Sequence, residues 1–182
     1  NIYYKNMTSI KQEDFPYRNI IYKNKNEVQI ESIKPLKKFD EERKPPGVWY
    51  GIKHHWAEFI DVSSSNKVYK IKNLFKLNLN KNSFTDINNP NKNKILVLKK
   101  VSDFVKFTNK YKDLTKNQIK WSDVMKDYAG IENPKILYNL HNWKFSDIKK
   151  NYSEIESWYY GWDVPSGVIW NNKVPHKVIK II

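Results

Sequence analysis

Apolar residues recur at every second position in several short runs of this 182-residue chain, and this alternation limits the fold more than any other feature. A period of two is typical of a strand that buries one face. It predicts a strand over Val28–Ile33, and one long strand or a bent pair over Val68–Ile71 and Leu74–Leu79. A Pro-Pro-Gly turn leads into a short strand over Val48–Ile52, and the apolar run Ile95–Leu98 is typical of a central strand.

Other segments carry apolar residues at helical spacing. A short helix is expected over His54–Ile60. Ser102 can cap a second helix, and Ser122 or Asp123 can cap a third that ends shortly before Gly130. The sequence therefore predicts an α+β protein, in which twisted sheets of short strands, mixed or antiparallel, combine with three or four helices.

The pattern along the chain indicates one domain, because it contains no internal repeat and no linker long enough to divide two domains. Residues 1–26 alternate aromatic and polar groups without a clear period, and we assign them to an N-terminal extension. Residues 27–182 are assigned to the single domain. Within it, the Asn-rich stretch Lys81–Lys94 predicts a loop, and Ser166–Trp170 predicts a last strand before a basic tail.

The absence of cysteine limits the chemistry that the chain can perform, and the absence of a long apolar run limits its cellular location. The chain has no cysteine, which excludes disulfides, cysteine-ligated zinc, iron–sulfur clusters and thiol nucleophiles. His54 and His55 form the one histidine pair, but neighbouring residues point to different sides of a helix or strand, so no metal is expected. No apolar run approaches the roughly 20 residues of a membrane-spanning helix. We expect an intracellular, cytoplasmic protein without a membrane partner, in the host cytoplasm or the virion if it is viral.

A formal net charge of +14 suggests a polyanionic partner such as nucleic acid. However, Arg18 and Arg43 are the only arginines among the 33 basic residues, and proteins that read bases or clamp phosphates favour the guanidinium group. Asn, Lys and Ile are abundant together, as an A/T-rich coding sequence would produce. Two origins of the charge stay open: salt-sensitive binding of nucleic acid with little sequence specificity, or codon bias alone.

Three segments carry the strongest functional signal. Lys44–Gly51 is a Pro-Gly turn that leads into a strand with two consecutive aromatic residues. Tyr128–Glu132 is a helix end that leads through a glycine to a carboxylate, and Trp158–Trp170 is rich in aromatic residues. Each segment alone also has a structural explanation, because aromatic residues of strands usually belong to the core and a single Glu beside a strand usually lies on the surface.

Taken in this order, the segments resemble a family of largely uncharacterised phage, bacterial and large-virus proteins. Its members share a strand like V-H-x-S, followed by K-P-x-G-L-W-x-S, Y-D-G-I-E-I and W-Y-Y-x-W-D-x-x-S-G-x-I-W. The matching segments here are Val28–Ser32, Lys44–Gly51, Tyr128–Glu132 and Trp158–Trp170, and the resemblance covers about residues 27–171. The layout looks like an ADP-ribosyltransferase fold, in which three motif strands form a cleft for NAD. The resemblance thus implies an ADP-ribosyltransferase-like domain over residues 27–182.

The resemblance also implies a site. Such enzymes break the bond between nicotinamide and ribose, while a glutamate stabilises the positive charge that develops on the ribose. An aromatic residue of the second strand stacks on nicotinamide, and a His or Arg of the first strand holds the ribose. Carried onto this chain, Glu132 is the catalytic carboxylate, and Trp49 or Tyr50 is the stacking residue. Gln29 takes the first-strand position, and Gly51 replaces a serine in the NAD cleft. NAD is then a substrate, and no metal takes part.

Several positions depart from the family pattern. Gln29 replaces His, Gly51 replaces Ser, Ala129 replaces Asp, and Asn133 stands where a β-branched residue is usual. These changes keep two alternatives open: a non-enzymatic, basic nucleic-acid-binding module and a virion-associated structural protein. If the protein is an enzyme, a basic and aromatic surface suits single-stranded DNA or RNA as the acceptor of ADP-ribose, and a protein acceptor is the alternative.

Overall fold

The computed structural model describes residues 8–22, 24–60, 68–116, 118–134, 158–159, 162 and 164–182. The helices in these ranges are α1 (His55–Ile60), α2 (Val101–Tyr111) and α3 (Trp121–Asp127), with the 3-10 helices η1 (Gln12–Asp14), η2 (Lys37–Glu41) and η3 (Lys81–Ser83). The strands are β1 (Thr8–Lys11), β2 (Arg18–Tyr22), β3 (Val48–Ile52), β4 (Val68–Ile71), β5 (Asn73–Leu79), β6 (Phe84–Thr85), β7 (Asn91–Val97), β8 (Lys112–Asp113), β9 (Gln118–Ile119), β10 (Tyr128–Asn133), β11 (Ser166–Ile169) and β12 (His176–Lys180). Tyr160, Gly161 and Asp163 of the last motif segment lie outside the described residues.

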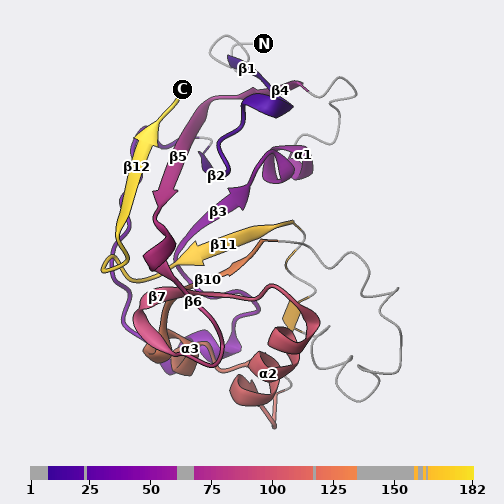
Figure 1. Cartoon of the computed structure of the whole chain (residues 1–182), viewed down its shortest axis with the longest axis vertical. Coiled ribbons are helices and arrows are strands. Elements are labelled where there is room, and N and C mark those ends of the chain that lie inside the picture. Colours follow the sequence, from indigo (N-terminus) through magenta and orange to yellow (C-terminus); the bar gives the residue numbers. More distant parts are fainter. Residues whose placement is uncertain are drawn as a thin grey trace.

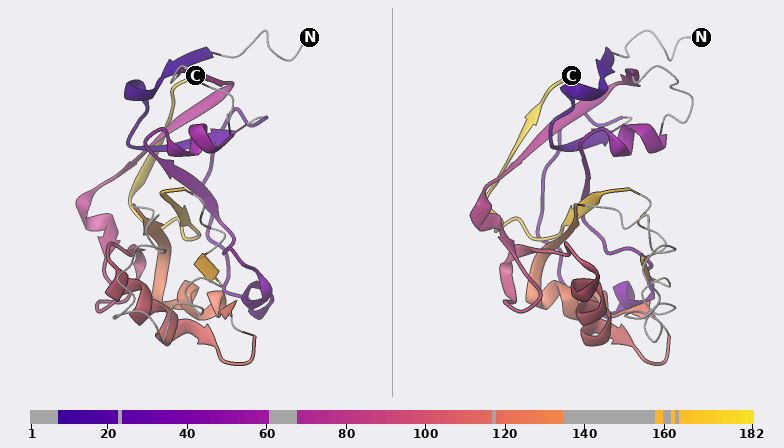
Figure 2. Two further views of the ribbon diagram at one scale, coloured as in Figure 1. Left: turned by 90° about the vertical axis from the view of Figure 1, so that its right-hand side faces the viewer. Right: turned by 45° about the vertical axis from the view of Figure 1, so that its right-hand side comes forward.

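Eight strands form one mixed sheet in the order β12-β5-β2-β3-β11-β10-β7-β6. β7 runs parallel to both of its neighbours, β10 and β6, and the other pairs of this sheet are antiparallel. The pairs β1–β4 and β8–β9 form two small separate sheets. Figures 1 and 2 show α2 and α3 at the end of the molecule that holds β6, β7 and β10, whereas α1 lies beside β3. The predicted α+β class, with a mixed sheet of short strands in one compact domain, is confirmed.

The sheet curls onto itself. The guanidinium carbon of Arg18, in β2, lies 4.6 Å from the ring centre of Phe84, in β6. Four strands separate β2 from β6, and because neighbouring strands lie about 4.8 Å apart, a flat sheet would hold the two strands about 24 Å apart. The contact therefore requires the sheet to bend toward the face that bears these two side chains. We call this face the concave face.

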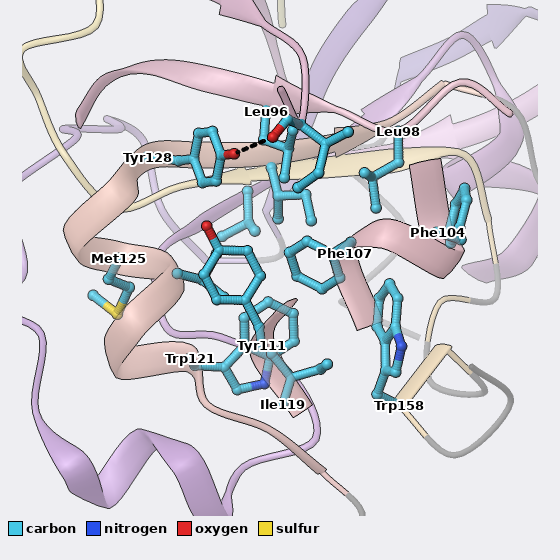
Figure 3. Packing of buried hydrophobic residues seen from close by; sticks show 14 of the residues in the cluster. Leu96, Leu98, Phe104, Phe107, Tyr111, Ile119, Trp121, Met125, Tyr128 and Trp158 are labelled. Atoms are coloured by element: carbon cyan, nitrogen blue, oxygen red, sulfur yellow. Dashed lines mark hydrogen bonds between the residues drawn. The ribbon is translucent and has the colours of Figure 1, made fainter. Parts of the chain in front are cut away.

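Each face of the sheet has its own core. On the concave face, buried side chains from both halves of the sheet pack together: Ile20, Tyr50, Ile52, Phe75, Leu77, Ile95 and Ile169. On the opposite face, α2 and α3 cover an aromatic cluster that includes Phe104, Phe107, Tyr111, Trp121, Tyr128, Trp158 and Trp170. Figure 3 shows the rings of Phe104, Phe107, Tyr111, Trp121 and Trp158 packed together beside the strands. The Tyr128 hydroxyl donates a hydrogen bond to the carbonyl of Ile87 at 3.4 Å. Burial of this many large rings stabilises the fold without disulfides.

Several strands differ from their predicted places. Val28–Ile33 forms no strand; Ile30 is buried, and the Ile33 N–H donates to the Trp170 carbonyl at 2.8 Å, so the alternation reflects an extended segment laid against the sheet. Residues 1–26 were predicted to form an extension, but they contain β2. This strand lies between β3 and β5 in the large sheet, and its residue Ile20 is buried in the core. The predicted loop Lys81–Lys94 contains β6 and the first four residues of β7, and the basic tail forms β12.

The predicted helices are present, but the residues that cap them differ from those expected. The Asp103 carboxylate, rather than Ser102, caps the start of α2 by accepting the N–H groups of Lys99 and Lys100 at 3.0 and 3.2 Å. The Asp40 carboxylate, from η2, accepts the N–H of Ser122 at 2.7 Å near the start of α3. α3 ends at Asp127, and Gly130 lies inside β10 instead of after a helix. In the described part of the chain, no helix has the length and apolar character to cross a membrane.

Asp127, at the end of α3, ties that helix to α2. Its carboxylate accepts hydrogen bonds from Lys110 Nζ at 2.8 Å and from the Tyr111 hydroxyl at 2.5 Å. Partial burial acts to raise the pKa of Asp127, but these donors and the Lys110 charge outweigh it and hold the pKa below its usual range. A carboxyl with a depressed pKa stabilises the folded state above the unfolded pKa and loses that contribution as pH falls.

We therefore expect Asp127→Asn to lower the free energy of unfolding by about 1 kcal/mol at pH 7, a small value because the pair is partly solvent-screened. The difference from the unsubstituted protein should shrink as pH falls below about 4. Urea unfolding at pH 7 and pH 3 measures it. An equal difference at both pH values would contradict the assigned role of the carboxylate.

Candidate functional site

The two consecutive aromatic residues of β3, Trp49 and Tyr50, lie on opposite faces of the sheet. Tyr50 is fully buried on the concave face. Trp49 packs on the other face against Trp162, with ring centres 4.9 Å apart. Gly51 lies against α1, where an added Cβ would be 2.7 Å from the Trp56 Cβ. A serine hydroxyl at position 51 would therefore face α1, and only Tyr50 of these three residues faces the interior of the curl.

Tyr50 reaches Glu132 across an intervening strand. Tyr50 pairs with Gly167 of β11, and Gly167 pairs with Glu132 of β10, so the three residues form one row on the same face. The Tyr50 ring lies over Gly167, and its hydroxyl donates to Glu132 Oε2 at 2.7 Å. An added Cβ at Gly167 would be 2.9 Å from Tyr50 Cε1 and closer still to the phenol carbon and oxygen. Glycine at this position is thus a condition for the contact.

Arg18 completes the group from the other side of the curl. Its Nε donates to Glu132 Oε2 at 2.6 Å and its Nη2 to Oε1 at 2.9 Å, which makes a bidentate pair. The guanidinium carbon also lies 4.6 Å from the ring centre of Phe84 and 5.0 Å from that of Tyr17. We call Arg18, Tyr50 and Glu132 the Glu132 cluster. It brings a cation from β2, a hydroxyl from β3 and a carboxylate from β10 to one point.

The cluster is deeply placed, and Arg18 is its accessible member. The Glu132 side chain is 2% exposed and the Arg18 side chain 17% exposed. Burial acts to lower the pKa of Arg18, but its hydrogen bonds to Glu132 and the carboxylate charge raise that pKa above its usual range. Burial, followed by the negative charge of Glu132, raises the pKa of Tyr50 well above its usual range. Arg18 therefore stays charged, and Tyr50 stays a neutral hydrogen-bond donor.

Gln29, the remaining residue that the resemblance assigned to NAD, lies apart from this cluster. Its amide donates to Glu27 Oε1 at 3.0 Å on the surface. It lines an open cavity of about 470 Å³ together with Tyr22, Lys25, Glu31 and Gly47. No member of the Glu132 cluster lines that cavity. Of the residues expected at the site, the structure brings together Glu132 and Tyr50, and it places Gln29, Trp49 and Gly51 elsewhere.

Two residues of the site were missed in the sequence. Arg18 lies in a stretch without clear periodicity, and the available signal was its rarity, since the chain has just one other arginine. β2 is the first strand of the large sheet along the chain, which is where the resemblance expected a His or Arg. Gly167 was noted as part of a motif, but its contact with Tyr50 depends on the pairing of β11 with β3.

Comparison of the chain with protein-family models, with curated proteins and with solved structures finds no match. The function is therefore inferred from the geometry of the Glu132 cluster. A buried carboxylate beside a guanidinium group and a neutral phenol can accept hydrogen bonds from ligand hydroxyls and stabilise positive charge. The guanidinium group can bind an anionic ligand group in a bidentate manner.

Proposed function

We propose that the protein is an ADP-ribosyltransferase-like enzyme that cleaves NAD at the Glu132 cluster. The observation that carries the proposal is the contact of three side chains: Arg18 from β2, Tyr50 from β3 and Glu132 from β10. β2 and β3 are the first two strands of the large sheet along the chain. This is the order of residue types that the resemblance implies for an NAD site. Arg18, rather than Gln29, takes the first-strand role in this proposal.

Each member of the cluster has a separate role in the proposed reaction. The bond between nicotinamide and C1′ of the ribose breaks, and nicotinamide leaves with the bonding electron pair. Glu132 accepts a hydrogen bond from a ribose hydroxyl and stabilises the positive charge on the ribose. A nucleophilic atom of the acceptor then forms the new bond to C1′ and releases its proton to solvent. Tyr50 donates to Glu132 Oε2 and keeps the carboxylate in place as a positioning residue.

Arg18 controls access to the carboxylate in this proposal. Because Glu132 is 2% exposed and bound at both oxygens by Arg18, a ribose hydroxyl reaches it only when the guanidinium group moves. The pyrophosphate of NAD offers Arg18 another anion, to which it can make the same bidentate contact. Arg18 is thus assigned to the pyrophosphate in the bound state and to Glu132 in the free state.

The test is nicotinamide release from NAD by the purified chain. We expect Glu132→Gln to reduce the rate by about 100-fold or more, since removal of one charge-stabilising group typically has an effect of this size. Glu41→Gln is the matched control, because Glu41 is an exposed glutamate of η2 that pairs with the surface residue Lys116. Circular dichroism confirms that both variants are folded. Equal release by the Glu132→Gln variant and the unsubstituted protein would contradict the mechanism.

Nucleic acid as acceptor is part of the proposal, and it is supported by the net charge of +14. The same assay, repeated with mixed single-stranded DNA or RNA, should then show faster nicotinamide release and transfer of label from NAD to the nucleic acid. Salt-sensitive binding of DNA or RNA without any NAD cleavage would favour the non-enzymatic binding module instead.

A further inference from the structure

The junction between β3 and α1 brings three possible metal ligands together on the outside of the molecule. His54 Nε2 lies 3.6 Å from Glu58 Oε2, and His55 Nδ1 lies 3.7 Å from the same oxygen. Each of the three residues has a ligand atom within 4.8 Å of those of the other two. This group is separate from the Glu132 cluster, and the proposed transfer reaction does not use it.

The backbone at Lys53 explains why two adjacent histidines converge. Neighbouring residues point apart, as expected for this pair from the sequence, only where both belong to one regular helix or strand. Lys53, however, has a left-handed conformation with φ of 53°, and its N–H donates to the Tyr17 carbonyl at 2.7 Å. This turn places His54 before the first residue of α1, so its ring centre lies 4.5 Å from that of His55. Glu58 then projects to the same side from the first turn of the helix.

The donor set and its spacing fit a transition metal. Two imidazoles and a carboxylate are ligands that Zn²⁺ binds at about 2.0–2.2 Å, which puts tetrahedral ligand atoms about 3.4 Å from one another. The separations of the two histidine nitrogens from Glu58 Oε2 exceed this value by a few tenths of an ångström, and all three ligand atoms lie within 4.8 Å of one another, so side-chain rotations would bring them to this spacing. Mg²⁺ and Ca²⁺ prefer oxygen ligands, so two nitrogen donors argue against them.

His54 already has a polar neighbour at the nitrogen assigned to the metal. The Gln12 side-chain amide, from η1, lies 2.7 Å from His54 Nε2. A metal ion bound at this nitrogen would take the place of the Gln12 contact.

We propose that His54, His55 and Glu58 form a Zn²⁺ site with three protein ligands. The His55 and Glu58 side chains are 34% and 63% exposed, so the ion enters from solvent and keeps at least one position open to water. All three ligands come from one short segment, so the ion fixes the turn between β3 and α1. The site holds metal whether or not the protein cleaves NAD.

Isothermal titration of the full metal-free chain with ZnCl₂ tests the site, in a buffer that does not bind zinc. We expect one Zn²⁺ per chain at micromolar concentrations, and intense visible absorption bands when Co²⁺ replaces Zn²⁺ in a four-coordinate site. His55→Ala and Glu58→Gln should each weaken binding by about tenfold or more, since even outer groups around metal sites have effects of that size. Both residues are accessible enough to be replaced without loss of the fold.

Two control variants are matched to these changes. His176→Ala removes a histidine of β12, and Glu42→Gln neutralises an exposed glutamate that follows η2. Both should bind Zn²⁺ like the unsubstituted chain. The proposal is overturned if the chain binds no Zn²⁺ at these concentrations, or if His55→Ala and Glu58→Gln bind as tightly as their controls.

Discussion

Arg18→Met is expected to lower the free energy of unfolding by about 3–5 kcal/mol, because it leaves a buried carboxylate without its cation. The Glu132 side chain is 2% exposed, and Arg18 supplies two of the hydrogen bonds that it receives. After the substitution the Tyr50 hydroxyl still donates to Oε2, but the charge has no partner of opposite sign. Methionine keeps much of the volume of the arginine stem, so the loss reports the charge rather than a cavity.

Glu132→Gln should lower the free energy of unfolding less than Arg18→Met does. Glu132→Gln removes the carboxylate charge, but Arg18 is 17% exposed and can turn its guanidinium group toward water. We expect a loss of about 1–3 kcal/mol, the size of a hydrogen bond to a charged group. The double variant, Arg18→Met with Glu132→Gln, should lose less than the sum of the two single losses, because neither side chain then leaves the other as an unpaired charge.

Urea unfolding of the four proteins gives the complete double-mutant cycle. The matched control is Lys116→Met, since Lys116 pairs with Glu41 at 2.8 Å on the surface, with side chains 47% and 71% exposed. This control should leave the free energy of unfolding nearly unchanged. If Arg18→Met were as mild as Lys116→Met, the buried pair would not contribute to the folded state as described.

Gly167→Ala is expected to destabilise the protein by about 1–3 kcal/mol and to break the hydrogen bond between Tyr50 and Glu132. The added methyl group would overlap the Tyr50 ring, which crosses Gly167 to reach the carboxylate. Both neighbours of Gly167 are strand residues in fixed register, so the backbone has little freedom to move away. The ring must then leave its place, and the effect should be seen in urea unfolding.

A second background shows whether the Tyr50 ring is the cause. In a Tyr50→Leu protein the shorter side chain no longer extends across position 167, so adding Gly167→Ala should cost clearly less than it does beside tyrosine. An equal cost in both backgrounds would mean that the methyl group acts through the β11 backbone and that the ring is not the cause.

Local sequence patterns predict the strands that carry the site residues. They do not predict that Tyr50 and Glu132 lie in contact. The Pro-Pro-Gly turn and the strand after it place Tyr50 correctly in β3, and Trp158–Trp170 contains β11 as expected. Alternation places Trp49 and Tyr50 on opposite faces of the strand, but it does not show which of the two faces Glu132. The choice depends on the register of β3 with β11, which is a long-range property.

The features that sequence analysis missed all depend on contacts between distant parts of the chain, which a local pattern does not contain. Arg18 contacts a residue 114 positions away, and its strand carries no clear alternation. Val28–Ile33 has a strand pattern because Ile30 is buried, yet a segment that lies against a sheet buries alternate residues as a strand does. The third helix ends shortly before Gly130 as predicted, but Gly130 is not its C-terminal cap, because β10 begins directly at Tyr128, where strand pairing overrides the local preference.

The position of β11 has a consequence for synthesis of the chain. The strands β12, β5, β2 and β3 form one half of the sheet and β10, β7 and β6 the other, and β11 is the strand between the halves. Its residues, Ser166–Ile169, leave the ribosome after every other strand of the sheet except β12. Until then the earlier strands can form only partial sheets with unpaired edges. Joining of the two halves is therefore a late step of folding, and nascent chains are exposed to aggregation until it occurs.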